Sequence, residues 1–279
     1  MAMILAAFPL RFVPTSLPRQ RRLARYIATV GVLLIAAGAM AAPKLSLYTE
    51  EWPPMTFTSG KGTPDGMAVE VVNELLHRTG QSNSIAVVPW MRGYKLLLTR
   101  PNVMLFTVGR NAERERNMTL LGPIAMSSTV LLARSEDVLA LQALGSDILK
   151  REVAAYQGSI FESTARNKGF SSTRETGSSE EGARMLLAKR VDLWVEGNIA
   201  VAQTLQRLGI APDRVSRVMT LDSLDLYLAF SRGTDRNTIL QWQTALRDMK
   251  KDGTFQAIHQ RWFPGEPAPP QVVRIGLEP

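Results

Sequence analysis

Apolar positions along the first half of the chain predict alternating strands and helices. Short apolar runs at 45–48, 85–88 and 103–108 have the length and pattern of β-strands. Between them, apolar residues recur at helical spacing, and the predicted inward faces carry Val69, Val72, Leu75 and Leu76 in one helix and Trp90, Tyr94, Leu97 and Leu98 in the next. A strand–helix–strand–helix–strand order favours a parallel sheet covered by helices.

A second run of the same kind follows. Strands are predicted at 153–156 and 191–195, and the pairs Ser159 with Glu162 and Ser178 with Glu181 have the spacing of a helix capping box. Asn198 is expected to cap a helix that reaches residue 208. Two strand-like pieces, 217–221 and 226–230, precede a long helix and a last helix that begins at Thr254. The proline-rich segment 264–279 is expected to be peripheral.

Two successive α/β units predict two lobes with a cleft between them. Ligands of open α/β sheets bind outside the carboxyl ends of the strands. We therefore expect a binding site where the strand-to-helix turns face the cleft.

The first 41 residues have the layout of an export signal. Residues 19–25 are rich in arginine, residues 26–40 are uncharged and largely apolar, and Ala39-Met40-Ala41 matches a cleavage site. An uncleaved membrane anchor is the alternative, but the apolar run is shorter than the ~20 residues that a spanning helix needs. We expect a cleaved signal peptide over residues 1–41 and a periplasmic mature protein.

Composition removes several classes of function. The chain has a net charge of +8, but the first 41 residues hold five arginines and no acid, and without them 28 basic residues face 25 acidic ones. The excess charge therefore belongs mostly to the leader, and we expect no nucleic-acid partner. The absence of cysteine excludes disulfides, thiol catalysis and cysteine-ligated metals. The two histidines have no metal-ligand spacing, so we expect neither a metal nor a cofactor.

Three segments are candidates for recognition. Tyr48 and Trp52 belong to an aromatic and proline-rich loop that either forms an apolar wall for a ligand or packs in the core. Residues 107–114 follow a predicted strand, and Thr107, Arg110 and Arg114 could meet an anion there. Gly158 and Ser159 open a helix, where backbone N–H groups can bind an anion or where Ser159 only caps. The adjacent acids Glu50 and Glu51 are interpreted as surface charge.

These motifs, taken in order, carry a family resemblance. The order is Trp52-Pro53-Pro54-Met55-Thr56-Phe57, Asp65-Gly66-Met67, Asn111-Ala112-Glu113-Arg114, Gly158-Ser159, Arg190-Val191-Asp192 and Lys251-Asp252-Gly253-Thr254, ending in Trp262-Phe263. The chain thus resembles the family 3 extracellular solute-binding proteins, the periplasmic receptors of polar amino acid ABC transporters. The likeness runs from about residue 44 to residue 263.

The resemblance implies an α/β type II periplasmic-binding fold with mixed, mainly parallel sheets. Lobe 1 would comprise 42–132 and 228–263, lobe 2 would comprise 133–227, and the hinge would lie near 131–134 and 226–231. The family's carboxylate-binding arginine corresponds to Arg114, and its second carboxylate contact corresponds to Gly158 and Ser159. Trp52 would pack on the ligand side chain. The partners implied are a small solute and either a membrane permease or a sensor protein, and we expect a monomer.

The chain departs from the family at the amine contact. The position where amino-acid receptors carry an acid is Gly197, so Glu196 or Asn198 would have to substitute, and the ligand need not be an amino acid. The leading interpretation is a non-enzymatic receptor for an anionic or zwitterionic solute. One alternative is a periplasmic dehydratase of the cyclohexadienyl dehydratase type with Glu196 as its acid, and another is a sensory receptor.

Overall fold

The structure, a computed structural model, describes residues 44–277. The predicted signal peptide lies outside the described residues. Eleven strands are present in the described part: β1 (Ser46–Thr49), β2 (Phe57–Thr58), β3 (Pro64–Asp65), β4 (Ile85–Val87), β5 (Val103–Gly109), β6 (Thr119–Arg134), β7 (Glu152–Tyr156), β8 (Ser172–Thr176), β9 (Leu193–Gly197), β10 (Val215–Phe230) and β11 (Val273–Gly276).

The α-helices lie between these strands, and α5 is one that the apolar spacing did not predict. Their bounds are α2 (Met67–Arg78), α3 (Trp90–Thr99), α4 (Ala112–Asn117), α5 (Val138–Gln142), α6 (Ile160–Asn167), α7 (Ser179–Leu187), α8 (Asn198–Arg207), α9 (Arg236–Lys251) and α10 (Thr254–Trp262). No helix among residues 44–277 is long and apolar enough to cross a membrane.

One mixed sheet organises the fold. Its strand order is β4-β1-β5-β10-β6-β9-β7-β8, and β11 pairs with β6 outside that path. Strand β1 runs parallel to β4 and β5, and β7 runs parallel to β8 and β9. The long strands β6 and β10 are antiparallel to their neighbours. Every residue of β5 is buried, as expected for a strand covered on both faces. The predicted α/β class is confirmed.

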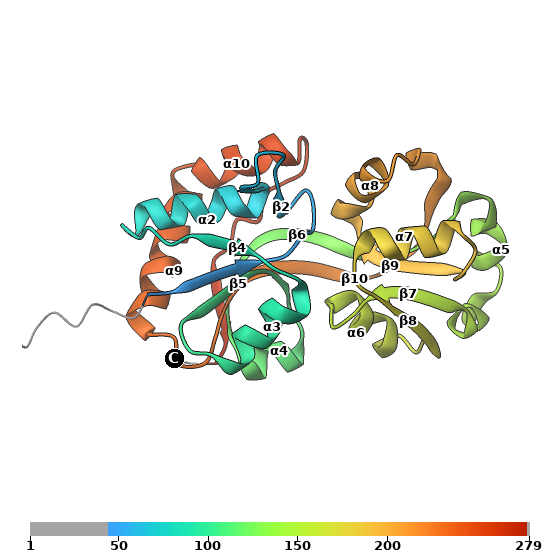
Figure 1. Cartoon of the computed structure of the whole chain (residues 1–279), viewed down its shortest axis with the longest axis horizontal. Coiled ribbons are helices and arrows are strands. Elements are labelled where there is room, and N and C mark those ends of the chain that lie inside the picture. Colours follow the sequence, from blue (N-terminus) through green and yellow to red (C-terminus); the bar gives the residue numbers. More distant parts are fainter. Residues whose placement is uncertain (1–43, 278–279) are drawn as a thin grey trace, which may run out of the picture. The chain divides into compact units, whose positions relative to one another are not determined.

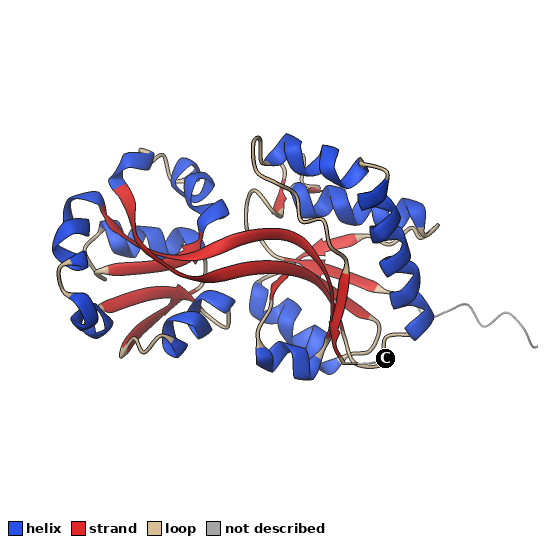
Figure 2. Ribbon diagram, turned by 180° about the vertical axis from the view of Figure 1, so that it is seen from behind, coloured by secondary structure: helices blue, strands red, loops and turns tan. Residues whose placement is uncertain are grey.

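Strands β6 and β10 join two lobes (Figures 1 and 2). At one end β10 pairs with β5 and β6 pairs with β11, and α2, α3, α4, α9 and α10 lie around them. At the other end β6 pairs with β9 over residues 129–132, and α5 to α8 lie around β7, β8 and β9. We call these ends lobe 1 and lobe 2.

The two strands stay paired with each other as they cross between the lobes. Ser127 and Ser128 of β6 lie opposite Leu224 and Ser223 of β10. The sequence predicted the hinge at 131–134 and 226–231, which are later parts of the same two strands. The predicted lobe boundaries at residues 132 and 227 stay a prediction, because a boundary of motion depends on how the lobes move.

Local details differ from several expectations. The pieces predicted at 217–221 and 226–230 form one strand, β10, because the polar residues between them lie in the crossing and still pair with β6. Asn198 is the first residue of α8 and not its cap, which is Gly197. Leu98 is 44% exposed, although it was predicted to point inward. Ser159 and Ser178 cap their helices as predicted, but Glu162 and Glu181 accept from the N–H groups of the preceding residues, Gly158 and Gly177, and not from the capping serines.

The proline-rich tail is part of the fold. Its strand β11 pairs with β6, so that Val273 lies opposite Gly122. The Lys250 ammonium donates to the carbonyls of Pro123, Pro269 and Gln271 at 2.7 to 2.8 Å, and it lies 4.5 Å from the Phe255 ring centroid. The expectation of a peripheral tail is therefore wrong. Backbone pairing between residues so far apart in the sequence was not predicted.

Candidate functional site

Strand ends from both lobes meet at a small cavity. Glu50 follows β1, Gly109 ends β5 and Tyr156 ends β7. The cavity measures about 20 Å³ for the centre of a water-sized sphere, room for about one water molecule. We call it the cleft cavity, and its lining is Glu50, Trp52, Trp90, Thr107, Gly109, Arg114, Tyr156, Ser159, Ile160, Phe161 and Leu226. Its position at the carboxyl ends of the strands is the one expected of an α/β ligand site.

Arg114 brings a buried positive charge to the cleft cavity. Asn111 caps α4 by accepting from the Arg114 backbone N–H at 2.9 Å, and this places the arginine side chain in the first turn. Only 3% of the residue is exposed. Its Nη1 donates to the Gly109 carbonyl at 2.7 Å, and its Nη2 donates to the Gly158 carbonyl at 3.3 Å.

Aromatic rings complete the surroundings of Arg114. Its guanidinium carbon lies 5.1 Å from the ring centroid of Trp90 and 5.4 Å from that of Tyr94. Burial lowers the pKa of Arg114, while Tyr94 and Glu50 act in the opposite direction. Among the described residues no salt bridge to Arg114 is present, and its two carbonyl bonds and its hydrogen bond with Tyr94 leave further N–H donors of the guanidinium for a ligand. The Arg114 guanidinium can therefore bind an anion.

The amino end of α6 lies beside the guanidinium. The Ser159 hydroxyl accepts from the N–H groups of Phe161 at 3.1 Å and Glu162 at 3.2 Å, so Ser159 caps the helix. The Glu162 carboxylate in turn accepts from the Gly158 N–H at 2.6 Å. Gly158 has a φ of 66°, and a Cβ there would lie 2.3 Å from the Met91 sulfur. Glycine is thus required for the turn and for its close packing against lobe 1.

Glu50 brings a buried acid to the same cavity. The residue is 8% exposed, and its Oε2 has no hydrogen-bond partner. Burial raises the pKa of Glu50 to about 8, hydrogen bonding with Tyr156 opposes that rise, and the neighbouring charge of Glu196 adds to it. The interpretation of Glu50 as surface charge is therefore wrong. Its neighbour Glu51 is exposed, since adjacent residues at a strand end point to opposite sides.

Glu196 is hydrogen-bonded to Trp52 and lies outside the lining of the cleft cavity. It is fully buried, and its Oε1 accepts from the Trp52 indole N–H at 3.1 Å and from the Gly197 N–H at 2.8 Å. Burial raises the pKa of Glu196 to about 7, against hydrogen bonds that include the one from Trp52. The Trp52 ring packs on Phe161 with centroids 5.8 Å apart. Glu196 does not line the cleft cavity and its Oε2 has no hydrogen-bond partner, whereas its bond to the indole N–H orients Trp52.

The other predicted site residues lie at different depths. Thr107 lines the cleft cavity and has a φ of 66°. Tyr48 is half-buried and packs in the apolar cluster of Trp90 and Val108, away from the cavity lining. Arg110 is exposed, and its guanidinium pairs with Glu115 at 2.5 Å. The structure thus brings Trp52, Thr107, Arg114, Gly158 and Ser159 together around the cavity and leaves Tyr48 and Arg110 outside its lining.

Sequence reasoning missed several lining residues, among them the polar or aromatic residues Glu50, Trp90 and Tyr156. Trp90 was assigned only to a helix core, yet its indole N–H donates to the Gly158 carbonyl at 2.9 Å. Tyr156 and Glu50 stand at the ends of correctly predicted strands. The rule that ligands meet strand ends could have identified both.

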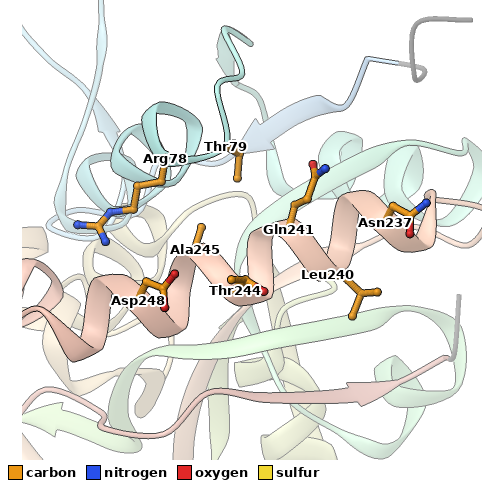
Figure 3. Close-up of a pocket in the computed structure, with 8 residues that line it drawn as sticks. All are labelled: Arg78, Thr79, Asn237, Leu240, Gln241, Thr244, Ala245 and Asp248. Carbon is orange, nitrogen blue, oxygen red and sulfur yellow. The ribbon is translucent and has the colours of Figure 1, made fainter. Parts of the chain in front are cut away.

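A larger hollow lies on lobe 1 but lacks the features of a site. It has a volume of about 780 Å³ and lies along the outer face of α9 and the end of α2 (Figure 3). Its lining comprises Arg78, Thr79, Asn237, Leu240, Gln241, Thr244, Ala245 and Asp248, of which only Ala245 is buried. No buried charged group faces it, so the cleft cavity is the candidate site.

Comparison with known proteins assigns the family. The family model described as bacterial extracellular solute-binding proteins, family 3, matches residues 46–265. The chain belongs to this family. No curated protein matches it in sequence.

Solved structures agree on the fold of this family 3 protein. A histidine kinase sensor domain similar to periplasmic binding proteins matches with a TM-score of 0.73 at 18% identity, covering 82% of this chain and 99% of that one. A lysine-bound His/Glu/Gln/Arg/opine family-binding protein from Silicibacter pomeroyi matches at 0.68 and 19%, covering 81% and 99%. An ancestral amino acid-binding protein, a precursor of cyclohexadienyl dehydratase, matches at 0.67 and 18%, covering 79% and 95%. The type II periplasmic-binding fold is therefore confirmed.

Proposed function

We propose that this protein is a periplasmic receptor that captures a small anionic or zwitterionic solute between its lobes for an ABC transporter. The observation that carries the proposal is the Arg114 guanidinium, buried in the lining of the cleft cavity without an acidic partner in the described part of the chain. A buried positive charge is stable only when other groups compensate it. A solute carboxylate can do so, because its two oxygens accept from two parallel N–H donors of the guanidinium. The predicted second anion contact at Gly158 and Ser159 stays a prediction, because the N–H groups of Gly158, Ser159, Phe161 and Glu162 already have partners within the turn.

The test is substitution of Arg114. A thermal-shift screen of amino acids, small carboxylates and polyamines identifies a binding solute, because a ligand of the folded state raises the melting temperature. Calorimetry with that solute then compares Arg114→Ala and Arg114→Lys with the parent protein. We expect Arg114→Ala to lose ~2 kcal/mol or more of binding free energy, because the solute anion would lie buried and unpaired. The affinity of Arg114→Lys should lie between those of the parent protein and Arg114→Ala, because lysine keeps the positive charge but lacks the paired N–H donors of the guanidinium.

The matched control is Arg116→Ala. Arg116 is exposed on the same short helix, α4, and carries the same charge. Its loss should leave the affinity almost unchanged. Equal affinities for the parent and Arg114→Ala would refute the assigned role.

A sensory role uses the same capture step. The similarity to a histidine kinase sensor domain favours it as a second candidate, with a membrane sensor in place of the permease as partner. Co-purification of the solute-loaded protein with its genomic neighbours, either a permease or a kinase, distinguishes the two.

An elimination reaction is the enzymatic alternative. It is favoured by the raised pKa of the buried acids and by the likeness to a precursor of cyclohexadienyl dehydratase. We propose that binding without turnover is the function, since Glu196, the acid predicted for the reaction, is bonded to Trp52 and does not line the cleft cavity. Incubation with prephenate or arogenate should then give no product.

A further inference from the structure

The first two residues of α3 contact the Gly158 turn of lobe 2. The Trp90 indole N–H donates to the Gly158 carbonyl at 2.9 Å. The Met91 sulfur packs directly on Gly158, so closely that a Cβ on the glycine would lie 2.3 Å from it. Because α3 belongs to lobe 1 and the turn precedes α6 of lobe 2, the thioether of Met91 is part of the contact between the lobes (Figure 1).

Met91 is also accessible to solvent, since 45% of the residue is exposed. The other exposed methionines among residues 44–277 are Met126 and Met219, which lie on β6 and β10 and not at the Gly158 turn. The chain contains no cysteine, so thioethers are its only readily oxidised sulfur atoms. Met91 thus combines an exposed thioether with a close contact between the lobes.

The sulfoxide of methionine does not suit this contact. Its oxygen is a polar acceptor, but the nearby donors are already used: the N–H groups of Gly158 and Ser159 and the indole N–H of Trp90 all have acceptors. A polar oxygen that is buried without a donor is unfavourable. Water can solvate the oxygen when Met91 and Gly158 move apart.

We propose that Met91 is a site of reversible oxidation whose sulfoxide shifts the protein toward separated lobes. The oxidant is a peroxide or a hypohalous acid. With hydrogen peroxide, an S–O bond forms and the O–O bond breaks, so that the thioether is oxidised to the sulfoxide and the peroxide is reduced to water. A dithiol-dependent sulfoxide reductase reverses the step, because two thiols become a disulfide and the oxygen leaves as water.

Movement at Gly158 also reaches the anion site. The Gly158 carbonyl accepts from Arg114 Nη2 at 3.3 Å, and the Trp90 ring centroid lies 5.1 Å from the guanidinium carbon. Oxidation of Met91 therefore acts on two neighbours of Arg114 as well as on closure. The inference goes beyond the receptor function and does not depend on which solute is captured.

The experiment compares the parent protein with Met91→Leu before and after treatment with hydrogen peroxide. Leucine keeps an apolar side chain of similar size but has no sulfur. Met126→Leu is the matched control, because it removes an exposed methionine that lies outside the Gly158 contact. Peptide mass spectrometry measures the sulfoxide at each methionine, and solution scattering without solute measures the radius of gyration.

We expect peroxide to oxidise Met91 and to increase the radius of gyration of the parent protein and of Met126→Leu, but not that of Met91→Leu. The unpaired oxygen should raise the ratio of open to closed molecules by about fivefold or more. Treatment with a methionine sulfoxide reductase and dithiothreitol should restore the original scattering curve. Without any oxidant, Met91→Gln should also expand the protein, because its amide places a polar group at the same contact, whereas Met126→Gln should not.

Three results would overturn the inference. The first is an equal response of the parent protein and Met91→Leu to peroxide, because another methionine would then be responsible. The second is an unchanged scattering curve for parent protein in which Met91 is fully oxidised. The third is a Met91 that stays reduced at a peroxide dose that oxidises Met126. Each of these results leaves the receptor function standing, since the test of Arg114 involves no oxidant.

Discussion

Single buried acids set the chemistry of the cleft. Glu50 and Glu196 approach it from different lobes, and burial raises the pKa of both. An acid whose folded-state pKa lies above its unfolded value holds a proton that the unfolded chain has already lost. The free energy of unfolding therefore falls as pH rises through the interval between the two values.

The variant Glu196→Gln tests this dependence of the unfolding free energy on pH. The interval for Glu196 runs from about 4.5 to about 7. We expect the parent protein to lose up to about 3 kcal/mol of stability relative to Glu196→Gln between pH 4.5 and pH 7, because glutamine has no proton to lose. Urea denaturation without solute at several pH values measures the difference. Glu136→Gln, an exposed site, is the control, and a parallel pH profile for parent and Glu196→Gln would contradict the expectation.

Residue roles were predictable where a motif fixed the geometry. The capping pair of Ser159 and Glu162 and the helix start before Arg114 place their side chains by local rules alone. Glu50 was missed because its depth depends on Tyr156, more than a hundred positions away. Tyr48 was misplaced for a similar reason, since the alternation of a strand does not tell which face meets the cleft.

At the scale of elements, apolar periodicity identified most of the helices and the buried strands β1, β5, β7 and β9, but it missed the long strand β6 and the short helix α5. It failed for β8, whose sequence Ser-Thr-Arg-Glu-Thr has no apolar residue because it is an edge strand. It divided β10 because the residues that cross between the lobes are polar. It also missed β11, whose position depends on backbone pairing with β6 and on Lys250.

Lys250→Met tests the attachment of the tail. The change leaves three carbonyl oxygens without their donor, so we expect a loss of about 2–4 kcal/mol in the free energy of unfolding. Lys251→Met, at the exposed neighbouring position, should cost about 0.5 kcal/mol or less. Urea denaturation compares the two, and limited proteolysis should cut first after residue 263 in Lys250→Met. Equal stability of both variants would show that Lys250 does not anchor the tail.

At the scale of the molecule, few polar contacts hold the lobes together around the cavity. Trp52 donates to Glu196, and both Trp90 and Arg114 donate to the Gly158 carbonyl. The cleft cavity between these contacts has room for about one water molecule. A solute of amino-acid size therefore requires the lobes to separate before it enters, and closure follows by bending of β6 and β10.

Trp52→Phe should shift this equilibrium toward separated lobes. Losing a hydrogen bond to a buried carboxyl costs about 1–3 kcal/mol, which changes the ratio of open to closed molecules by about fivefold or more. We expect solution scattering without solute to give a larger radius of gyration than for the parent. Trp262→Phe is the matched control, because its indole N–H bonds to Glu70 inside lobe 1. Identical scattering curves for both variants would contradict this view of the contacts.

The paired crossing of β6 and β10 also offers a place from which to watch the protein work. Met126 lies there opposite Asp225, and it is 49% exposed. Because the chain contains no cysteine, a Met126→Cys variant would present one thiol for a fluorescent dye. The dye would lie on the two strands that bend when the lobes close, so its fluorescence intensity would report solute binding in real time.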